Sequence, residues 1–432
     1  MNIFRELRRR EQFGRTIRVV VVGQGAMGRG VAAQLAVTPG MIPAILVSRN
    51  VARAVETWVK LGFGREDVVV SDDVHRLAAA VERGLPAVSR DVCVATGVRG
   101  VEAVVEATGR VEDGARAALS AIHAGKHVVV IGAALDATIG CYLCERARQQ
   151  GVVYTRSDGT PSAVLMRLLE WVNGLGGEVL AAVQARDAPD VFAVPENLPE
   201  SHQRWRSRLQ TVCSFVDGTQ MNLESAVLAN ASGLLPKVRG MLGVRTDRRH
   251  AVRDFVRIGA GKPMVDYAVS KDLAGGFFVI ARCGEPERVG HWFEASRMGN
   301  GPEYLFLRPH GLSCAELPLS IGEAVIAREP TLAPRGAPVA EVVALAKRDL
   351  REGERLDGIG GAMVYGEVDT VEGASGLLPI GLLEGARLLC SIQKGDPIPK
   401  GAVEYEEGAV VPNLRHLQDT LFSAFQPTLM SA

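Results

Sequence analysis

A glycine pattern between a strand and a helix constrains the fold of this chain more than any other feature. Residues 17–22 (IRVVVV) give an aliphatic strand signal, and Gly23, Gly25 and Gly28 follow in the spacing G-x-G-x-x-G. A helical pattern then begins, and a second apolar segment ends about twenty residues later. Strand, glycine turn, helix and second strand in this order predict a βαβ unit that binds a dinucleotide.

Each glycine has its own expected role in that turn. Gly23 permits the tight bend, a side chain at Gly25 would block a pyrophosphate, and one at Gly28 would hold the helix away from the strand. The helix begins near Ala26 and Met27, where free N–H groups and the helix dipole favour phosphate. We expect these five residues to contact the cofactor. The alternative is a tight turn with no ligand.

The end of the second strand bears on which dinucleotide is bound. NAD enzymes usually place Asp or Glu there, whereas this chain has Ser48, Arg49 and Asn50, with Arg53 one turn later. The missing carboxylate removes repulsion against a 2′-phosphate, and the Arg49 guanidinium suits a phosphate. We expect NADP, with NAD possible. The alternative is an exposed arginine in a protein that does not discriminate.

Two further strand ends should lie near the nicotinamide. Thr108 and Gly109 are expected beneath its ribose, and Ala133 and Ala134 along its face. Ordinary βα turns are the alternative. The sequence has no second flavin motif, metal-ligand cluster or nucleophile elbow, which indicates hydride transfer without a catalytic metal.

The whole chain is expected to be α/β. Residues 1–155 alternate strand and helix signals and predict a doubly wound Rossmann domain. Residues 156–325 read as an inserted α+β substrate domain. After a Pro-rich linker, residues 338–407 show short β runs and glycine turns, which predict a small all-β domain. Residues 408–432 form a C-terminal tail.

The composition of the chain limits the kinds of binding partner that we expect. Basic and acidic residues balance at 49 each, which argues against nucleic acid, and no apolar run is long enough to span a membrane. The C-x-x-C formed by Cys141 and Cys144 falls inside a helical pattern, so we expect buried thiols in a reducing, cytoplasmic compartment. The expected partner is a small-molecule substrate, and a homo-oligomer is possible.

Several segments carry a family resemblance. Residues 106–154, with EATG followed by GARAALSAIHAGKHVVVIGAALDATIGCYLCERARQQGVVY, are similar to the cofactor domain of homoserine dehydrogenases and their relatives. SFVDGTQMNLESAVLANASGLLPKVRGM, EYLFLRPHGLSCAELPLSIGEAVI and GLLPIGLLEGARLLCSIQKGDPI resemble homoserine dehydrogenase-like oxidoreductases with a C-terminal SAF domain. One branch, the 1-deoxyxylulose-phosphate reductoisomerase-like enzymes, makes methylerythritol phosphate with NADPH. The resemblance implies a SAF-like fold for residues 338–407.

The chain departs from that branch at three places. The branch's Gly-Asn-x-Lys-Gly segment is AAVQARDAPD here, so Arg186 replaces the lysine as nearest cation and Asp187 follows. Its Asp-Gly-Asp-Gln-Pro-Gly is reduced to SDGTPS, and its Arg-Pro-Tyr-His to RPHG. The resemblance therefore implies dehydrogenase chemistry more directly than isomerisation.

Hydride transfer to a carbonyl needs a proton donor and a cation near the developing alkoxide. Lys237 is the first candidate for that role, with a surface lysine after a helix end as the alternative. Arg239 is the candidate clamp for an anionic substrate. Asn230, near a helix end, is the candidate pocket amide.

Three loop residues complete the candidate set. Asp158 follows a strand end, where it could meet substrate or stabilise a turn. Arg308 and His310 flank a proline after a strand, and His310 could titrate near neutrality or merely be exposed.

The sequence thus predicts an NADP-dependent oxidoreductase acting on a small polar hydroxy or carbonyl compound, expected to be phosphorylated or carboxylated, with a reductoisomerase as one form. A homoserine-type dehydrogenase is one alternative. A catalytically silent NADP-binding sensor or scaffold is another.

Overall fold

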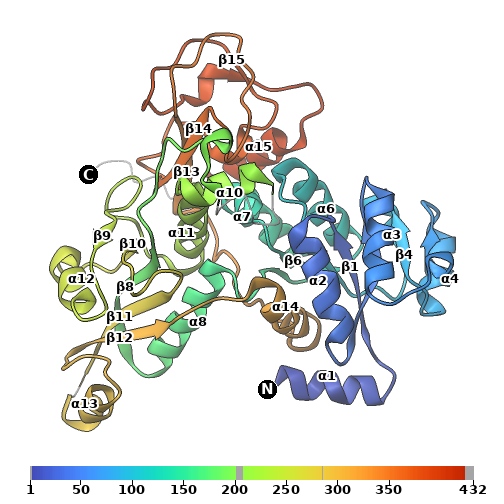
Figure 1. Ribbon diagram of the computed structural model, residues 1–432, viewed down its shortest axis with the longest axis horizontal. Coiled ribbons are helices and arrows are strands. Elements are labelled where there is room, and N and C mark those ends of the chain that lie inside the picture. Colours follow the sequence, from blue (N-terminus) through green and yellow to red (C-terminus); the bar gives the residue numbers. More distant parts are fainter. Residues whose placement is uncertain (1, 201–207, 285, 424–432) are drawn as a thin grey trace. The chain divides into compact units, whose positions relative to one another are not determined.

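The computed structural model describes residues 2–200, 208–284 and 286–423, which form two compact units (Figure 1). The first unit comprises residues 1–159, 312–336 and 406–432, and the second comprises residues 160–311 and 337–405. Each unit is therefore built from separate stretches of sequence. No helix in the described residues is long and apolar enough to cross a membrane.

The first unit is built on a seven-stranded sheet with the order β3-β4-β2-β1-β5-β6-β7. All neighbouring strands are parallel. The strands are β1 (Ile17–Val22), β2 (Met41–Val47), β3 (Val69–Val70), β4 (Ala87–Ser89), β5 (Ala103–Glu106), β6 (His127–Val130) and β7 (Tyr154–Arg156). This is the expected doubly wound Rossmann sheet. Its strand order reverses at β1, whose neighbours β2 and β5 create the crevice in which such sheets bind ligands.

Helices precede, connect and follow these strands. They are α1 (Ile3–Gln12), α2 (Ala26–Val37), α3 (Val51–Lys60), α4 (Val74–Glu82), α5 (Val92–Thr96), α6 (Val111–His123), α7 (Ala133–Gln149), α14 (Ser313–Gly322), the short turns η1 (Arg65–Asp67) and η3 (Glu323–Ala327), and α15 (Val410–Ser423). The strands are buried almost throughout, because helices cover a parallel sheet on both faces.

Helix α14 belongs to this first unit, although the expected boundaries place its residues in the second domain. Leu317 and Ile321 are fully buried in one core with Leu7 of α1 and Leu35 of α2. The sequence shows α14 as an apolar helix but does not show which core it completes.

The second unit contains a mixed five-stranded sheet with the order β12-β11-β8-β10-β9. Strand β8 is parallel to β10 and antiparallel to β11. The strands are β8 (Gly177–Arg186), β9 (Val244–Arg245), β10 (Met264–Val269), β11 (Phe277–Cys283) and β12 (Glu303–Arg308). The accompanying helices are α8 (Pro161–Gly174), η2 (Pro195–Asn197), α10 (Leu209–Val216), α11 (Thr219–Ser232), α12 (Ala251–Gly259) and α13 (Pro286–Ala295).

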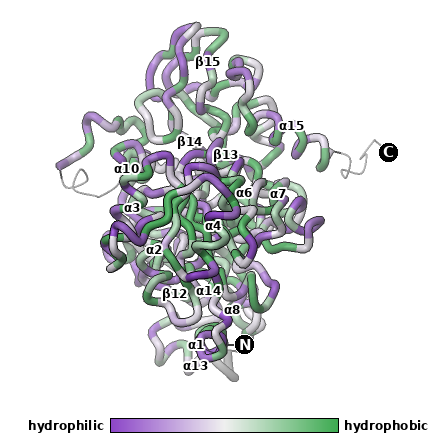
Figure 2. Tube along the Cα trace, turned by 90° about the vertical axis from the view of Figure 1, so that its right-hand side faces the viewer, coloured by the Kyte–Doolittle hydropathy of each residue, from purple (hydrophilic) through white to green (hydrophobic). Residues whose placement is uncertain are grey.

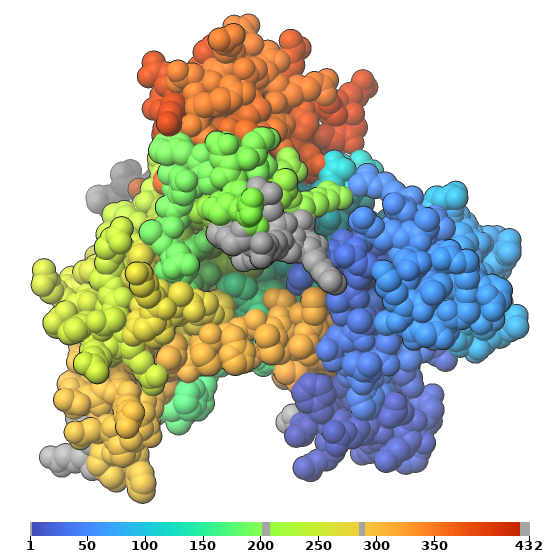
Figure 3. All heavy atoms as spheres, in the orientation of Figure 1, coloured from blue at the N-terminus to red at the C-terminus, as the bar shows by residue number. Residues whose placement is uncertain are grey.

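Residues 337–405 complete the second unit with short β elements. They are β13 (Ala340–Ala346), β14 (Val364–Thr370), η4 (Ile380–Leu382), β15 (Arg387–Leu388), η5 (Lys400–Ala402) and β16 (Val403–Glu404). Strands β13 and β14 pair antiparallel, as do β15 and β16. Hydrophobic and hydrophilic residues alternate along the loops around β15 (Figure 2). The orange and red residues of this segment rest directly on green residues of the same unit (Figure 3).

Candidate functional site

The glycine turn after β1 combines close backbone packing with open space. Gly23 has φ +101°, and a Cβ there would lie 2.5 Å from the Ala107 carbonyl oxygen. A Cβ on Gly28 would lie 1.9 Å from the Gly23 oxygen, so only glycine lets α2 approach β1. A Cβ on Gly25 would meet nothing within 4 Å. Gly25 therefore leaves open space in front of the backbone, whereas Gly23 and Gly28 permit close packing.

Helix α2 starts at this open space. Gly25 is its N-cap and provides no side-chain cap, so the helix begins with backbone N–H groups at Ala26 and Met27. The Met27 side chain is partly exposed. Its sulfur lies 3.9 Å from Sγ of Cys314 on α14. An uncapped helix start beside a bare glycine is a suitable place for an anion.

The residues after β2 are held by local hydrogen bonds. Ser48 Oγ accepts from Asn50 N–H at 3.1 Å, and Asn50 Oδ1 accepts from Arg53 N–H at 3.0 Å as the N-cap of α3. Arg49 instead forms an ion pair of 3.0 Å with Asp113 of α6, and its side chain is 71% exposed. The guanidinium expected to meet a 2′-phosphate therefore already faces a carboxylate.

The end of β5 contains a buried carboxylate that sequence reasoning treated only as part of a strand end. Glu106 Oε1 accepts from Thr108 N–H at 2.7 Å and from its hydroxyl at 2.6 Å. A Cβ on Gly114 or Gly132 would crowd that carboxylate, at 3.1 and 3.2 Å. Burial raises the pKa of Glu106, and the Thr108 hydrogen bonds oppose the rise. Thr108 thus shapes the turn, while Gly109 (φ +70°) faces open space.

Ala133 is the first residue of α7, and its side chain is buried. Asp158 is also buried in the first unit. Its backbone N–H donates to Ser320 Oγ at 2.7 Å, and its Oδ1 accepts from the Gly159 N–H at 2.9 Å. The turn-stabilising role of Asp158 is therefore visible.

Two candidates of the second unit make structural contacts. Lys237 Nζ donates to the carbonyl oxygens of Ile258 and Gly259, at 2.8 and 2.5 Å, and so closes the end of α12. Asn230 is buried, and its side chain forms hydrogen bonds with the backbone of Val339 and Ala340, at the start of β13. Both side chains therefore have a structural role, holding backbone groups in place, which the sequence did not reveal. The roles predicted from the sequence stay predictions.

Arg308 is the last residue of β12 and is half-buried, and His310 is exposed in the loop that follows. Neither lines the pocket described next.

A pocket of about 140 Å³ lies within the second unit. The start of α11, neighbouring loops and the middle of strands β10 and β14 form it, and Arg239 is the one candidate from sequence among its lining residues. The lining residues are Pro189, Val191, Asp217, Gly218, Met221, Asn222, Arg239, Gly240, Met241, Tyr267, Gly366 and Glu367. Tyr267 and Glu367 belong to strands without a recognisable motif, so sequence reasoning missed them.

The charges of this pocket are largely paired. Arg239 Nε contacts Asp369 Oδ2 at 2.8 Å, and its Nη2 donates to the Gly373 oxygen at 2.9 Å. Burial raises the pKa of Glu367, while the Arg239 charge acts against the rise. Burial also raises the pKa of the Tyr267 hydroxyl. The pocket therefore offers both hydrogen-bond donors and an acceptor.

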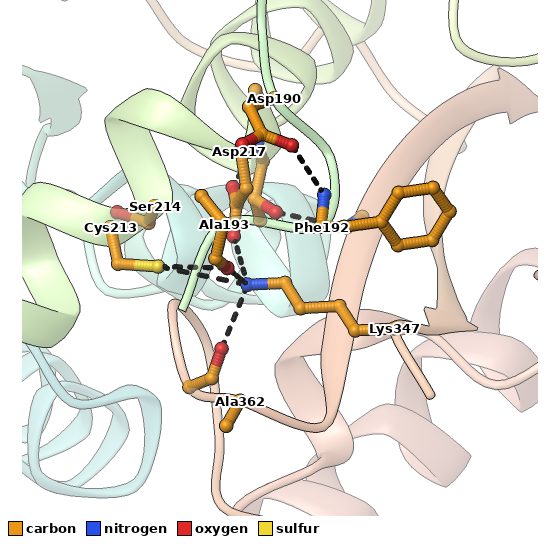
Figure 4. Close-up of polar contacts among 12 residues, drawn as sticks. Asp190, Phe192, Ala193, Cys213, Ser214, Asp217, Lys347 and Ala362 are labelled. Carbon is orange, nitrogen blue, oxygen red and sulfur yellow. Dashed lines mark hydrogen bonds and ion pairs between the residues drawn. The ribbon is translucent and has the colours of Figure 1, made fainter. Parts of the chain in front are cut away.

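Asp217 of this pocket is paired with a lysine from residues 337–405. Lys347 Nζ donates to Asp217 Oδ2 at 2.8 Å and to the carbonyl oxygens of Ala193 and Gly361 at 2.6 and 2.7 Å (Figure 4). Both charged side chains are at most 1% exposed. All three hydrogens of the Lys347 ammonium group thus have acceptors. Lys347 therefore has a structural role in holding these segments together and does not offer a free amine.

Arg186, which stands where the reductoisomerase-like branch has lysine, lies at the end of β8. Its guanidinium bonds the Phe215 carbonyl oxygen. Burial lowers its pKa, and the nearby Tyr267 and Asp217 oppose that shift. Arg186 is therefore part of the electrostatic surroundings of two pocket residues.

Comparison with known families assigns two segments of the chain. Residues 159–317 match the family model of the catalytic domain of oxidoreductase DRL. Residues 341–404 match the SAF domain. The chain therefore carries an oxidoreductase catalytic domain followed by a SAF domain. No curated protein sequence matches the chain.

Solved structures share only a distant likeness with it. An NAD-binding oxidoreductase from Klebsiella pneumoniae is 19% identical (40% of this chain, 43% of that one, TM-score 0.29). DOX-P reductoisomerase with NADPH, fosmidomycin and magnesium is 12% identical (49% and 58%, TM-score 0.34). A 3-ketoreductase from Actinomadura kijaniata with TDP-benzene and NADP is 15% identical (74% and 91%, TM-score 0.36). The chain spans less than two thirds of the first two, and TM-scores this low support no inference about activity.

Proposed function

We propose that this chain is an NADP-dependent oxidoreductase that transfers hydride to or from a small polar hydroxy or carbonyl compound. The observation that carries the proposal is the open space at Gly25 in front of the α2 N-terminus, in a chain whose residues 159–317 match an oxidoreductase catalytic domain. A bound nicotinamide would supply the hydride acceptor or donor.

The residues of the chain have separate tasks in this proposal. Gly25, Ala26 and Met27 bind the diphosphate through backbone N–H groups. Glu106 and Thr108 keep the turn after β5 in one shape through two short hydrogen bonds. The pocket of the second unit binds substrate, with Arg239 and Tyr267 as donors. Lys237, Asp158, Arg308 and His310 remain candidates for the proton transfer that accompanies hydride transfer.

Two finer forms of the activity follow from the resemblance: a reductoisomerase and a homoserine-type dehydrogenase. A catalytically silent NADP-binding sensor is the competing function. The engagement of Lys237 with the end of α12 favours it, because an ammonium held by two carbonyl oxygens is less available as a proton donor.

Calorimetry with NADPH and NADH tests the proposal. Gly25→Leu should weaken dinucleotide binding at least about tenfold, since its side chain would occupy the space that a pyrophosphate needs. The melting temperature should not change, because that space is empty of protein atoms. Gly174→Leu is the matched control, as a Cβ there also meets nothing within 4 Å.

Unchanged binding of both dinucleotides to Gly25→Leu would contradict the proposal. Stereospecific hydride transfer with any member of a hydroxy-carbonyl panel supports the enzyme. Tight NADPH binding without turnover on the whole panel supports the sensor.

A further inference from the structure

The SAF domain forms part of the wall of the pocket in the catalytic domain. Gly366 and Glu367 of β14 line this pocket together with residues of α11, β10 and the loop after α11. Residues 160–311 of the catalytic domain belong to the same compact unit as the SAF domain. A domain that contributes pocket residues can contribute to ligand selection as well as to stability.

Strand β14 is fixed against the catalytic domain by backbone hydrogen bonds on both sides of Glu367. The Gly366 N–H donates to Thr219 Oγ1 at 2.9 Å, and the Val368 N–H donates to Asn222 Oδ1 at 2.8 Å. The Gly240 N–H donates to the Val368 oxygen at 2.8 Å. A one-residue slip of β14 would break all three bonds, so residue 367 is held in register.

Glu367 has no hydrogen bond or ion pair with any other residue that the structure describes, although its carboxyl group is partly buried. Two other carboxylates at or beside the pocket form ion pairs: Asp217 with Lys347 and Asp369 with Arg239. The Glu367 carboxylate therefore keeps its acceptor capacity for a ligand in the pocket that donates hydrogen bonds.

The neighbouring loop adds backbone strain to the same pocket. Met241 is buried and has φ +70°, an unfavourable conformation for a residue with a Cβ. Asp266 holds the loop by accepting from the N–H groups of Leu242 and Gly243, at 3.1 Å each. Strained backbone of this kind concentrates at ligand-binding sites.

We propose that Glu367 of the SAF domain is a specificity-determining residue, which accepts hydrogen bonds from hydroxyl groups at an uncharged end of the substrate. This inference rests on the proposed function, because it assigns the pocket to the substrate. Tyr267 and the remaining N–H groups of Arg239 donate to the same ligand.

Charge balance disfavours an anion at this position, even with the Arg186 guanidinium nearby, because the carboxylates of Asp217 and Asp266 also lie close to the pocket residues. The Arg239 charge is already opposed by Asp369, so an added phosphate or carboxylate would face Glu367 with little compensation. An ammonium would gain Glu367 but would lie near Arg239. The volume of 140 Å³ corresponds to about four or five waters of liquid, which suits one end of a small hydroxylated compound. The anion clamp expected at Arg239 is therefore not assigned to this pocket.

A matched three-carbon series tests the inference: glycerol, glycerate and 2-amino-1,3-propanediol. Dissociation constants for the full chain are measured by ligand-observed NMR. Wild-type protein should bind glycerol more tightly than glycerate. Glu367→Gln, which keeps the shape of the side chain, should raise the affinity of glycerate relative to glycerol by about tenfold. The exposed Glu372→Gln of the same domain should leave this ratio unchanged.

Three outcomes overturn the inference: failure of glycerol to bind, tighter binding of glycerate or of the amine by wild-type protein, or an identical ratio in Glu367→Gln and wild type. NADPH binding is measured on the same samples. Retained NADPH binding with any of these results defeats the inference alone, whereas loss of dinucleotide binding in wild type defeats the proposed function.

Discussion

Arg49 is the residue on which we expect the choice between dinucleotides to depend. Its ion pair with Asp113 is exposed, and such pairs contribute only about 0–1 kcal/mol. A 2′-phosphate can therefore displace Asp113 and take the guanidinium. Arg49→Ala should weaken NADPH binding about tenfold and leave NADH binding unchanged. Asp113→Asn should strengthen NADPH binding a few-fold, roughly by the worth of the surface pair.

Calorimetric dissociation constants for both cofactors check this prediction. Arg65→Ala serves as the control, because Arg65 forms a similar exposed pair with Glu56. Equal weakening of NADPH and NADH by Arg49→Ala would show that Arg49 does not read the 2′-phosphate.

Sequence reasoning succeeded at the residue scale where the signal is local. The spacing of Gly23, Gly25 and Gly28 is read directly, and the structure leaves no room for a Cβ at Gly23 or Gly28 and open space at Gly25. Contact between these glycines and a cofactor stays a prediction. Prediction from sequence was less complete where a side chain contacts a residue that is distant in the sequence. Lys237 meets the end of a helix 21 residues away, and nothing near Lys237 in the sequence announces that contact.

At the scale of elements, Lys347, the residue after β13, joins the SAF domain to Ala193 and Asp217 of the catalytic domain. Replacing Lys347 by Met would leave Asp217 buried without its cation, and such losses cost about 3–5 kcal/mol. We expect a clear fall in the denaturation midpoint of Lys347→Met. The double variant Lys347→Met with Asp217→Asn should recover part of the loss, because it removes the uncompensated charge.

Urea denaturation followed by circular dichroism measures these differences. The exposed Lys262→Met is the control for a lost lysine charge. A single variant as stable as wild type would show that the pair does not anchor the domain. A double variant less stable than the single would show that the cost does not come from the Asp217 charge.

The helices and strands themselves were largely predictable, because the spacing of apolar residues and the glycines at their ends indicate each type of element. Their assembly was less so. Helix α14 reads as an ordinary apolar helix, yet its partners Leu7 and Leu35 lie some three hundred residues away. The β14 register depends on Thr219 and Asn222 of α11, which a sequence read along one strand cannot supply.

For the whole molecule, buried His127 predicts a loss of stability in mild acid. Burial and the nearby Arg328 lower the pKa of His127 from 6.5 to about 4. Between these values the unfolded chain takes up a proton that the folded chain refuses, so stability is full above pH 6.5 and falls towards pH 4. The loss in the free energy of unfolding between pH 6.5 and pH 4 amounts to up to about 3 kcal/mol.

The free energy of unfolding, measured from pH 7 to pH 4, should fall less steeply for His127→Gln than for wild type or for the exposed control His75→Gln. Parallel slopes for all three proteins would mean that His127 carries no part of the acid sensitivity.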